Sequence, residues 1–389
     1  MPRILKSSIS EMDKRARKIM IVFGTRPEAI KLCPLVKELE KHTDKFKTVV
    51  CVTAQHREML DQVLRIFDIV PDHDLNLMKR GQTLFDMTSG ILLKVGQVVE
   101  KEKPEFLIVQ GDTTTTFASS LAAYYYKVKV GHVEAGLRTG NKYAPFPEEI
   151  NRKLTTAIAD IHFAPTENAK ANLISEGVRE KDVVVTGNTV IDALLWVRGK
   201  IKGETKTYKE LDEVDFKKKI ILVTGHRREN FGRDLINICQ ALKAIAARHG
   251  DIQIVYPVHL NPNVRKPVYD LLSGVRNIKL MEPLNYEPFI YLMDRCHIII
   301  SDSGGVQEEA PSLGKPVLVT RTMTERPEAV EAGAVMLVGT NSDRIVAEAE
   351  RLIRDSEHYT KISRIQNPYG DGHSCERIVK TLDRFLSSI

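Results

Sequence analysis

The stretch HIIISDSGGVQEEA, residues 297–310, joins an uninterrupted apolar run to a helical pattern through a Ser-Gly-Gly turn. The stretch IMIVFGTRPEAIK, residues 19–31, repeats this arrangement near the start of the chain. There Gly24 permits the turn, and Pro27 suits the first turn of a helix. Apolar strands that lead directly into helices are typical of parallel sheets with helices on both faces. The two stretches therefore predict an α/β fold in both halves of the chain.

Short apolar runs alternate with helical patterns along all 389 residues, a length that exceeds what one core usually supports. The charged, apolar-poor segment 199–219 interrupts the alternation, and we interpret it as a hinge linker. We expect a flexible extension over 1–17 and two Rossmann-like, doubly wound domains over 18–198 and 220–373. A last helical pattern, 374–389, has no strand after it. The expected strands are Ile19–Phe23, Thr48–Val52, Phe106–Val109, Val128–Val133, Ile161–Ala164, Val183–Thr186, Ile220–Thr224, Ile252–Tyr256, Ile278–Met281, His297–Ser301, Val317–Thr320 and Val335–Val338.

Composition narrows the class of protein. Residues 1–18 hold six cations and two acids and so carry four of the six net positive charges. The rest of the chain lacks the excess of a basic nucleic-acid-binding face, so we expect no nucleic-acid partner. The five cysteines form no C-x-x-C pair, which favours a reducing, cytoplasmic compartment and no zinc site. No apolar stretch is long enough for a bilayer, and we expect no membrane insertion.

Two X-Arg-Pro turns place cations at strand ends. Arg26 precedes Pro27 at the start of a predicted helix, and Lys31 lies one turn further on. A helix N-terminus attracts anions, so both cations are candidates for binding a phosphate. Arg326 precedes Pro327 in the same way in the second half. The alternative is that these residues are ordinary surface cations, which arginine often is.

The Ser303-Gly304-Gly305 turn is the second candidate phosphate site. Two glycines let phosphate oxygens come close to backbone N–H groups at the helix start. Glu309 lies about one helical turn further on, where a carboxylate would accept hydrogen bonds from ribose hydroxyls. Neither turn is G-x-G-x-x-G, so we expect no nicotinamide cofactor, and the site residues call for no cofactor or metal. The alternative is an ordinary strand–helix turn.

Candidate acid–base groups follow strands of the first half. Asp112 follows a buried strand, although it could instead cap the next helix. Glu134 lies at an apolar strand end, where a carboxylate needs a partner or a raised pKa. Glu148 and Glu149 open a helix, and one of them could simply complement the helix dipole. His226 follows the first strand of the second half and could donate to a sugar hydroxyl or a diphosphate oxygen.

Ten strings in order now give the chain a family resemblance: FGTRPEAIK, TAQHREMLDQ, GDTTTT, HVEAGLRTG, PEEINR, TGHRRENFG, YPVHLNPNVR, SDSGGVQEEAPSLGKPVL, TERPEAV and NPYGDG. The chain resembles the non-hydrolysing UDP-N-acetylglucosamine 2-epimerases from about Lys18 to its C-terminus. The resemblance implies the glycosyltransferase-B architecture, in which two Rossmann-like domains face a cleft and the C-terminal helix crosses back to the first domain. It also implies interconversion of UDP-GlcNAc and UDP-ManNAc for cell-surface polysaccharide synthesis, by a homodimer.

The resemblance assigns roles by position. It places catalytic or near-catalytic groups at Asp112, Glu134, Glu148 and His226, and nucleotide-sugar-binding groups at Arg26, Lys31, Leu284, Phe289, Ser303, Gly304, Gly305, Glu309 and Arg326. Gln55, Arg227 and His259 match a regulatory UDP-GlcNAc site of bacterial members. Glu58 and Gly81 stand where regulated members have Gln and Arg, which argues against activation by substrate.

The implied chemistry explains these residue types. The C2 proton of N-acetylglucosamine is not α to a carbonyl, and loss of UDP from C1 is what acidifies it. Elimination to 2-acetamidoglucal and readdition require a diphosphate cradle and acid–base groups on both faces of C2. Four other functions remain open: a retaining glycosyltransferase of the same architecture, an epimerase of a modified UDP-HexNAc, a hydrolysing epimerase that releases free ManNAc, and a non-catalytic sugar-nucleotide sensor.

Overall fold

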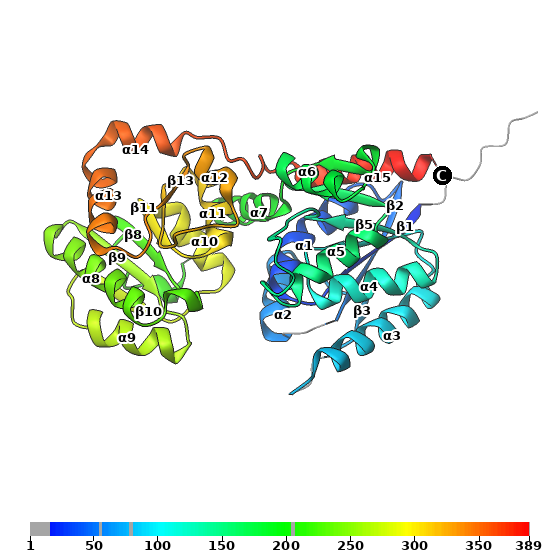
Figure 1. Cartoon of the computed structure of the whole chain (residues 1–389), viewed down its shortest axis with the longest axis horizontal. Helices are drawn as coiled ribbons and strands as arrows, with labels where there is room; N and C mark the ends of the chain where they lie inside the picture. Colours follow the sequence, from blue (N-terminus) through cyan, green and yellow to red (C-terminus); the bar gives the residue numbers. More distant parts are fainter. Residues whose placement is uncertain (1–15, 54–56, 78–80, 204–206, 389) are drawn as a thin grey trace, which may run out of the picture.

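Two parallel β-sheets, each covered by helices, form two lobes that lie side by side (Figure 1). The computed structural model describes residues 16–53, 57–77, 81–203 and 207–388. We call the seven-stranded sheet and its helices the first lobe, and the six-stranded sheet and its helices the second lobe. Each strand pairing in both sheets is parallel, as the continuous apolar runs predicted.

The first lobe has strand order β3-β2-β1-β4-β5-β6-β7. The order reverses between β1 and β4, and their carboxyl ends lead into Gly24–Arg26 and Gly111–Asp112. Ligands of doubly wound sheets bind at such a switch point. Its strands are β1 Arg17–Phe23, β2 Phe46–Val52, β3 His73–Asp74, β4 Phe106–Gln110, β5 Lys129–Val133, β6 Ile161–Ala164 and β7 Val183–Val185; its helices are α1 Arg26–Glu40, α2 Arg57–Ile66, α3 Leu84–Glu102, α4 Thr114–Tyr125, α5 Glu148–Ile158 and α6 Glu167–Ser175, with a 3₁₀ turn at Glu180–Asp182.

The second lobe has strand order β10-β9-β8-β11-β12-β13. Its switch point lies between β8 and β11, which lead into Gly225–His226 and Asp302–Gly304. Its strands are β8 Lys219–Thr224, β9 Ile252–Pro257, β10 Ile278–Met281, β11 Ile298–Ser301, β12 Val317–Val319 and β13 Val335–Leu337; its helices are α8 Arg233–Arg248, α9 Pro262–Leu272, α10 Tyr286–Arg295, α11 Gly304–Glu309, α12 Pro327–Glu331, α13 Ser342–Arg354 and α14 Ser356–Ser363, with 3₁₀ turns at Arg228–Asn230 and Ala310–Leu313.

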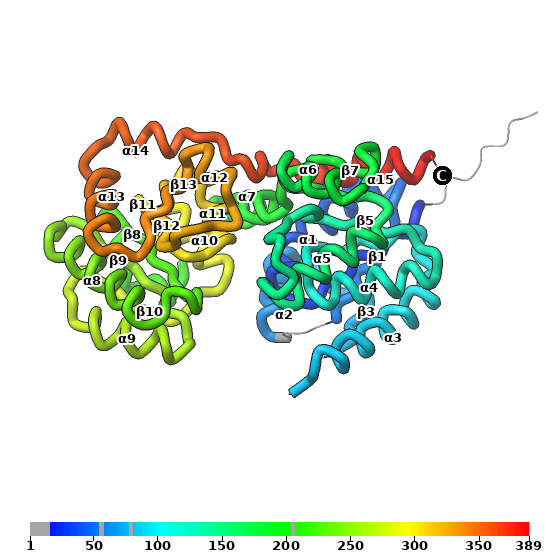
Figure 2. The backbone as a smooth tube through the Cα atoms, in the orientation of Figure 1, coloured from blue at the N-terminus to red at the C-terminus, as the bar shows by residue number. Residues whose placement is uncertain are grey.

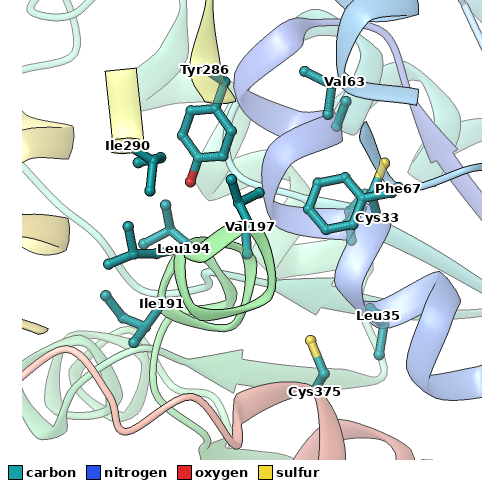
Figure 3. Packing of buried hydrophobic residues seen from close by; sticks show 14 of the residues in the cluster. Cys33, Leu35, Val63, Phe67, Ile191, Leu194, Val197, Tyr286, Ile290 and Cys375 are labelled. Atoms are coloured by element: carbon teal, nitrogen blue, oxygen red, sulfur yellow. The ribbon is translucent and has the colours of Figure 1, made fainter. Parts of the chain in front are cut away.

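Helix α7, Thr189–Gly203, ties the lobes together. Its apolar side chains Ile191, Leu194 and Val197 are fully buried, and they lie between Ile290 of α10 on one side and α1 and α2 on the other (Figure 3). One apolar cluster therefore runs from the first lobe into the second. Burying a Leu or Ile side chain contributes about 1.5–3 kcal/mol, so this shared apolar cluster stabilises the contact between the two lobes.

The chain crosses between the lobes a second time near its end. After α14 it returns to the first lobe, where α15, Ser374–Ser387, packs against α1 and α7 (Figure 2). The helix has no side-chain cap of its own. Instead the carboxylate of Asp192 on α7 accepts from the backbone N–H groups of Ser374 and Cys375, at 3.2 and 2.8 Å.

The structure differs from the sequence expectations at three places. Helix α7 continues through Gly203, so the expected linker 199–219 begins inside a helix; Ile201 stays on its apolar stripe and is buried. Arg17 belongs to β1 rather than to the expected extension, whose residues 1–15 lie outside the described part of the chain. His73 and Asp74 form a short edge strand that is not among the twelve expected strands. No described helix has the length and apolarity to cross a membrane.

Candidate active site

A cavity of about 540 Å³ opens between the lobes, next to Asp112 at the first-lobe switch point and to Arg227 near the second-lobe switch point. Acidic residues from the first lobe and arginines from the second share its wall. A diphosphate sugar needs this combination, because its phosphates require cations while its sugar requires acid–base groups. The wall is formed by Asp112, Glu134, Leu137, Arg138, Thr139, Ala144, Pro145, Arg152, Thr166, Asn168, Ala169, Asn172, Arg227, Glu325, Arg326, Pro327 and Glu328.

Glu134 is held in place from three sides directly after β5. Its φ of 63° lies in the left-handed region, which is strained for a non-glycine residue. Its carboxylate pairs with Lys31 and accepts from Gln110 at 3.0 Å and from Asn188 at 2.9 Å. Strained backbone of this kind often occurs at functional sites, where the surroundings overdetermine the conformation.

Electrostatics keep both members of this pair charged. Burial favours the neutral form of Glu134, but the Lys31 ammonium and the hydrogen bonds outweigh it and hold the carboxyl pKa below its ordinary value. Burial likewise favours neutral Lys31, and the charges of Glu134 and Glu308 overcome that effect and raise its pKa. Glu134 is therefore an ionised carboxylate, the state that a general base requires.

Asp112 pairs with Arg152 of α5, and its backbone oxygen accepts from Asn151 at 3.0 Å. The preceding Gly111 has a φ of 74° and accepts from the ring of buried His132 at 2.7 Å. Helix α4 is capped by Thr113, whose side chain accepts from the backbone of Thr116. The alternative role of Asp112 as a helix cap is therefore filled by its neighbour, and its carboxylate faces the cavity.

Glu148 and Glu149 have opposite surroundings. Glu149 is fully buried and accepts from the backbone N–H groups of Thr139 and Gly140, each at 3.1 Å, and from Arg152 at 3.0 Å. Among the described residues, Oε2 of Glu148 is buried and has no hydrogen-bond partner. Glu149 thus supports the 139–140 loop, whereas Glu148 keeps a buried oxygen that has no hydrogen-bond donor among the described residues and does not belong to the cavity wall.

Asp302 organises the 225–230 loop of the second lobe. It accepts from the backbone N–H groups of His226 and Arg227, at 3.0 and 2.9 Å, and from Asn230 at 3.2 Å. The His226 ring lies 3.2 Å from its carboxylate through Nδ1. Burial works against the charged form of Asp302, but these hydrogen bonds and His226 prevail and lower its pKa. The loop is fixed with the His226 ring partly exposed.

Two arginines converge on the Ser303–Gly305 turn. A Cβ placed on Gly304 would lie 3.7 Å from the Arg227 guanidinium and 3.9 Å from that of Arg326. Arg326 also pairs with the buried Glu308. Nε of Arg227 is buried and lacks a hydrogen-bond partner in the described part of the chain. Glycine backbone beside two guanidinium groups is a suitable cradle for a diphosphate.

The proposed ribose carboxylate Glu309 lies beyond this turn. Tyr286 donates to its Oε1 at 2.7 Å, and its Oε2 lies 3.8 Å from the position of a Cβ on Gly305. Burial raises the pKa of Glu309 to about 7, although Tyr286, Lys31 and Arg26 oppose the shift. Burial lowers the pKa of Arg26, whose charge interacts with Tyr286 and Glu309. The first-lobe Arg-Pro turn therefore approaches Tyr286 and Glu309 of the second lobe.

The remaining candidates lie around this centre. Leu284 is buried in the segment that precedes α10. Phe289 lies within α10 and packs against the apolar cluster that the two lobes share. The ring of His259 lies 5.8 Å from that of His226. Arg227, expected at a regulatory site, lines the central cavity itself. Gln55 lies outside the described residues.

Sequence reasoning missed several supporting residues. They lie far along the chain from the groups they hold, so no local motif could pair them: Gln110, Arg152, Asn188, Tyr286, Asp302 and Glu308. The buried strand-end position of Asp302 was a usable signal, because a carboxylate there needs donors.

Comparison with known proteins identifies the family. The sequence model described as UDP-N-acetylglucosamine 2-epimerase matches residues 37–383. The chain belongs to the UDP-N-acetylglucosamine 2-epimerase family. The Escherichia coli K12 enzyme of that name is 57% identical over 94% of this chain and 98% of its own length. The Salmonella typhimurium enzyme is 56% identical over 96% and 100%. This epimerase family membership confirms the resemblance predicted from the ten strings.

Solved structures of epimerases confirm the fold. The Neisseria meningitidis UDP-GlcNAc 2-epimerase bound to UDP-GlcNAc superposes with a TM-score of 0.86, at 53% identity over 94% of this chain and all of that one. A Rickettsia africae glycosyltransferase is 15% identical with a TM-score of 0.63 and shares the fold alone. The predicted α/β architecture of two Rossmann-like domains facing a cleft is confirmed.

Proposed function

We propose that this epimerase interconverts UDP-GlcNAc and UDP-ManNAc without net hydrolysis, and that it supplies cell-surface polysaccharide synthesis. The observation that carries the proposal is the shared cavity wall, on which Asp112 and Glu134 of the first lobe accompany Arg227 and Arg326 of the second. UDP-GlcNAc is the molecule bound in the Neisseria meningitidis relative.

In the forward direction, the C1–O bond breaks and its electron pair leaves with the β-phosphate of UDP. A carboxylate removes the C2 proton, and the C2–H electron pair becomes the C1=C2 double bond of 2-acetamidoglucal. A proton then adds to the opposite face of C2 while the phosphate oxygen attacks C1. The atoms balance, and no external oxidant, reductant or cofactor takes part.

We assign the diphosphate to Arg326, Arg26 and the Ser303–Gly305 turn, and the ribose to Glu309. The hydrogen-bond donors of the turn and the guanidinium groups would stabilise the charge that develops on the leaving phosphate. Lys31 would keep Glu134 ionised for its role as a base. Asp112 and Glu148 are the candidate groups for the other face of C2, and His226 is a candidate donor to the diphosphate.

Incubation with UDP-GlcNAc in D₂O tests this function. We expect NMR to show that UDP-GlcNAc becomes a mixture with UDP-ManNAc and that both epimers carry deuterium at C2. Release of free ManNAc and UDP would instead indicate a hydrolysing enzyme. Conversion that requires an acceptor would indicate a transferase, and turnover only of a modified UDP-HexNAc would change the substrate. An unlabelled, unchanged sugar would contradict the proposal.

We also propose a cytoplasmic homodimer. Phe85 and Leu93 on α3 and Tyr124 and Tyr125 on α4 are exposed apolar side chains on neighbouring helices, a surface that suits a second copy. All five cysteines are free and buried, as in proteins of reducing compartments. Light scattering of wild type and Leu93→Glu would test the dimer, and cell fractionation would test the location.

A further inference from the structure

Asn188 occupies the junction where the lobes meet. It is 3% exposed and directly precedes α7, the helix shared by both lobes. Its backbone N–H donates to Tyr369 in the returning C-terminal segment, at 2.7 Å. The preceding Gly187 has a φ of 84°, and a Cβ there would lie 2.7 Å from Ser374 Oγ. The backbone of Asn188 is thus fixed from both sides.

The side chain of Asn188 contacts both lobes. Its amide nitrogen donates to Oε2 of Glu134 at 2.9 Å and to Oε2 of Glu308 at 3.1 Å. Its oxygen accepts from the backbone N–H of Val190 at 3.1 Å. Because that N–H needs an acceptor, the amide group is orientated with its two hydrogens toward the two carboxylates. One residue therefore satisfies an acid of each lobe.

The two carboxylates belong to opposite parts of the reaction. Glu134 is the first-lobe base, and Glu308 pairs with Arg326, which lies beside the Gly304 turn. Two buried carboxylates that share one donor would repel each other without the intervening hydrogens. Lys31 pairs with Glu134, and Arg326 pairs with Glu308. The two positive charges therefore neutralise the two carboxylates, and the Asn188 amide connects the two ion pairs across the lobes.

We propose that Asn188 is a positioning residue that links the proton-transferring Glu134 to the Glu308–Arg326 pair at the diphosphate turn. The inference rests on the proposed function, because it takes the roles of Glu134 and Arg326 from it. A diphosphate that accepts from Arg326 weakens the attraction between Arg326 and Glu308. The negative charge of Glu308 then acts on Glu134 through the shared amide. Diphosphate binding thereby strengthens Glu134 as a base.

Asn188→Asp tests the link. Asp keeps the shape and the oxygen that accepts from Val190, but it replaces both N–H donors with an acceptor. We expect kcat to fall by about 100-fold while KM for UDP-GlcNAc changes by less than about threefold. The lower limb of the kcat–pH profile should move to higher pH, because an added carboxylate disfavours ionised Glu134.

Asn341→Asp is the matched control. Asn341 caps α13, where its side chain accepts from the backbone of Arg344 at 3.0 Å, outside the cavity. The same exchange of amide for carboxylate there should leave kcat and its pH profile unchanged. An Asn188→Asp enzyme with wild-type kcat and an unmoved profile would overturn the inference.

A double variant distinguishes two roles of Asn188: positioning the carboxylate of Glu134, or only holding the two lobes together. Glu308→Gln with Asn188→Asp exchanges the amide and the carboxylate between these positions and restores the charge count, which favours a folded protein. If Asn188 only fastens the lobes, the double variant will exceed Glu308→Gln alone in kcat, and the inference fails. If it positions Glu134, kcat will fall by a further factor of about 100. Absence of any epimer from the wild type would instead refute the proposed function.

Discussion

At the scale of single residues, helix geometry separates two neighbouring acids. Consecutive helical side chains point about 100° apart, so Glu149 turns into the protein while Glu148 keeps a buried oxygen without a described partner. A buried carboxylate oxygen without a donor costs stability, and natural structures usually retain such groups for function. The two residues should therefore respond oppositely to the same substitution.

We expect Glu148→Gln to lower kcat by about 100-fold or more while leaving the unfolding midpoint unchanged or higher, because it removes the charge from a carboxylate whose buried Oε2 has no donor among the described residues. Glu149→Gln should cost about 2 kcal/mol, since it breaks hydrogen bonds to Thr139, Gly140 and Arg152. Urea unfolding and NMR assays of epimer formation measure both effects. Equal stabilities of the two variants would contradict this division.

Glu309 should make substrate affinity depend on pH. Burial raises its pKa to about 7, so its ionised fraction grows as the pH rises from 6 to 8. In the proposed complex the ribose hydroxyls donate to the ionised form of Glu309, and we therefore expect binding to become tighter as the pH rises. The pyrophosphate of UDP-GlcNAc has no ionisation in this range, so calorimetry with this ligand isolates the protein's contribution.

We expect UDP-GlcNAc to bind up to about tenfold more tightly at pH 8 than at pH 6. Glu309→Gln has no titrating group and should remove that slope. A slope that persists in Glu309→Gln would show that another group is responsible.

Residue types at strand ends were enough to find most of the candidate centre. Asp112, Glu134 and the Ser303–Gly305 turn all follow strands whose apolar runs are visible in the sequence. The partners of these groups were not predictable in the same way. Asn188 meets Glu308 across 120 positions, and only the folded packing of α7 between the lobes brings them together.

At the scale of elements, the capping box of α1 joins two turns of the candidate site. Glu28 is buried and accepts from the backbone of Gly24 and Thr25 and from the hydroxyl of Thr113, which caps α4. Thr116 also donates to it, at 3.3 Å. The Arg26 turn and the Asp112 turn are thus set relative to each other by one carboxylate.

Glu28→Ala should cost about 3–5 kcal/mol, because it leaves several buried donors unpaired. Asp86→Ala is the control: Asp86 completes the same kind of capping box with Thr83 at the exposed start of α3, and its loss should cost about 1 kcal/mol. Thermal and urea unfolding measure both. A Glu28→Ala cost no larger than that of Asp86→Ala would show that the turns are held by other contacts.

Element boundaries were less predictable than element types. The twelve expected strands all exist, since each carries its own apolar run. The two-residue β3 has no such run and is defined by its pairing with Cys51 and Val52 of β2. Helix α7 outlasts the expected boundary because Ile201 finds a buried site that the charged residues around it conceal in the sequence.

At the scale of the whole molecule, the lobes are fastened on one side of the cavity by Glu328. This residue of α12 accepts from Thr166 and Asn168 of the first lobe, at 2.9 and 3.2 Å. It also accepts from Tyr369 in the returning C-terminal segment, at 2.9 Å. Thr166 caps α6, so the carboxylate lies near a helix N-terminus that favours negative charge. These contacts favour the arrangement in which both lobes line one cavity.

Glu328→Gln should loosen that arrangement, because an amide supplies one acceptor oxygen where a carboxylate supplies two. Losing about 1.4 kcal/mol of closure free energy would raise KM for UDP-GlcNAc roughly tenfold and leave kcat nearly unchanged, since the bound complex still closes. Small-angle scattering of the unliganded variant should show a larger radius of gyration that saturating UDP-GlcNAc reverses. Glu331→Gln, an exposed change in the same helix, should alter neither quantity. A Glu328→Gln enzyme with wild-type KM and radius of gyration would mean that α7 and the apolar cluster around it alone determine how the two lobes are arranged.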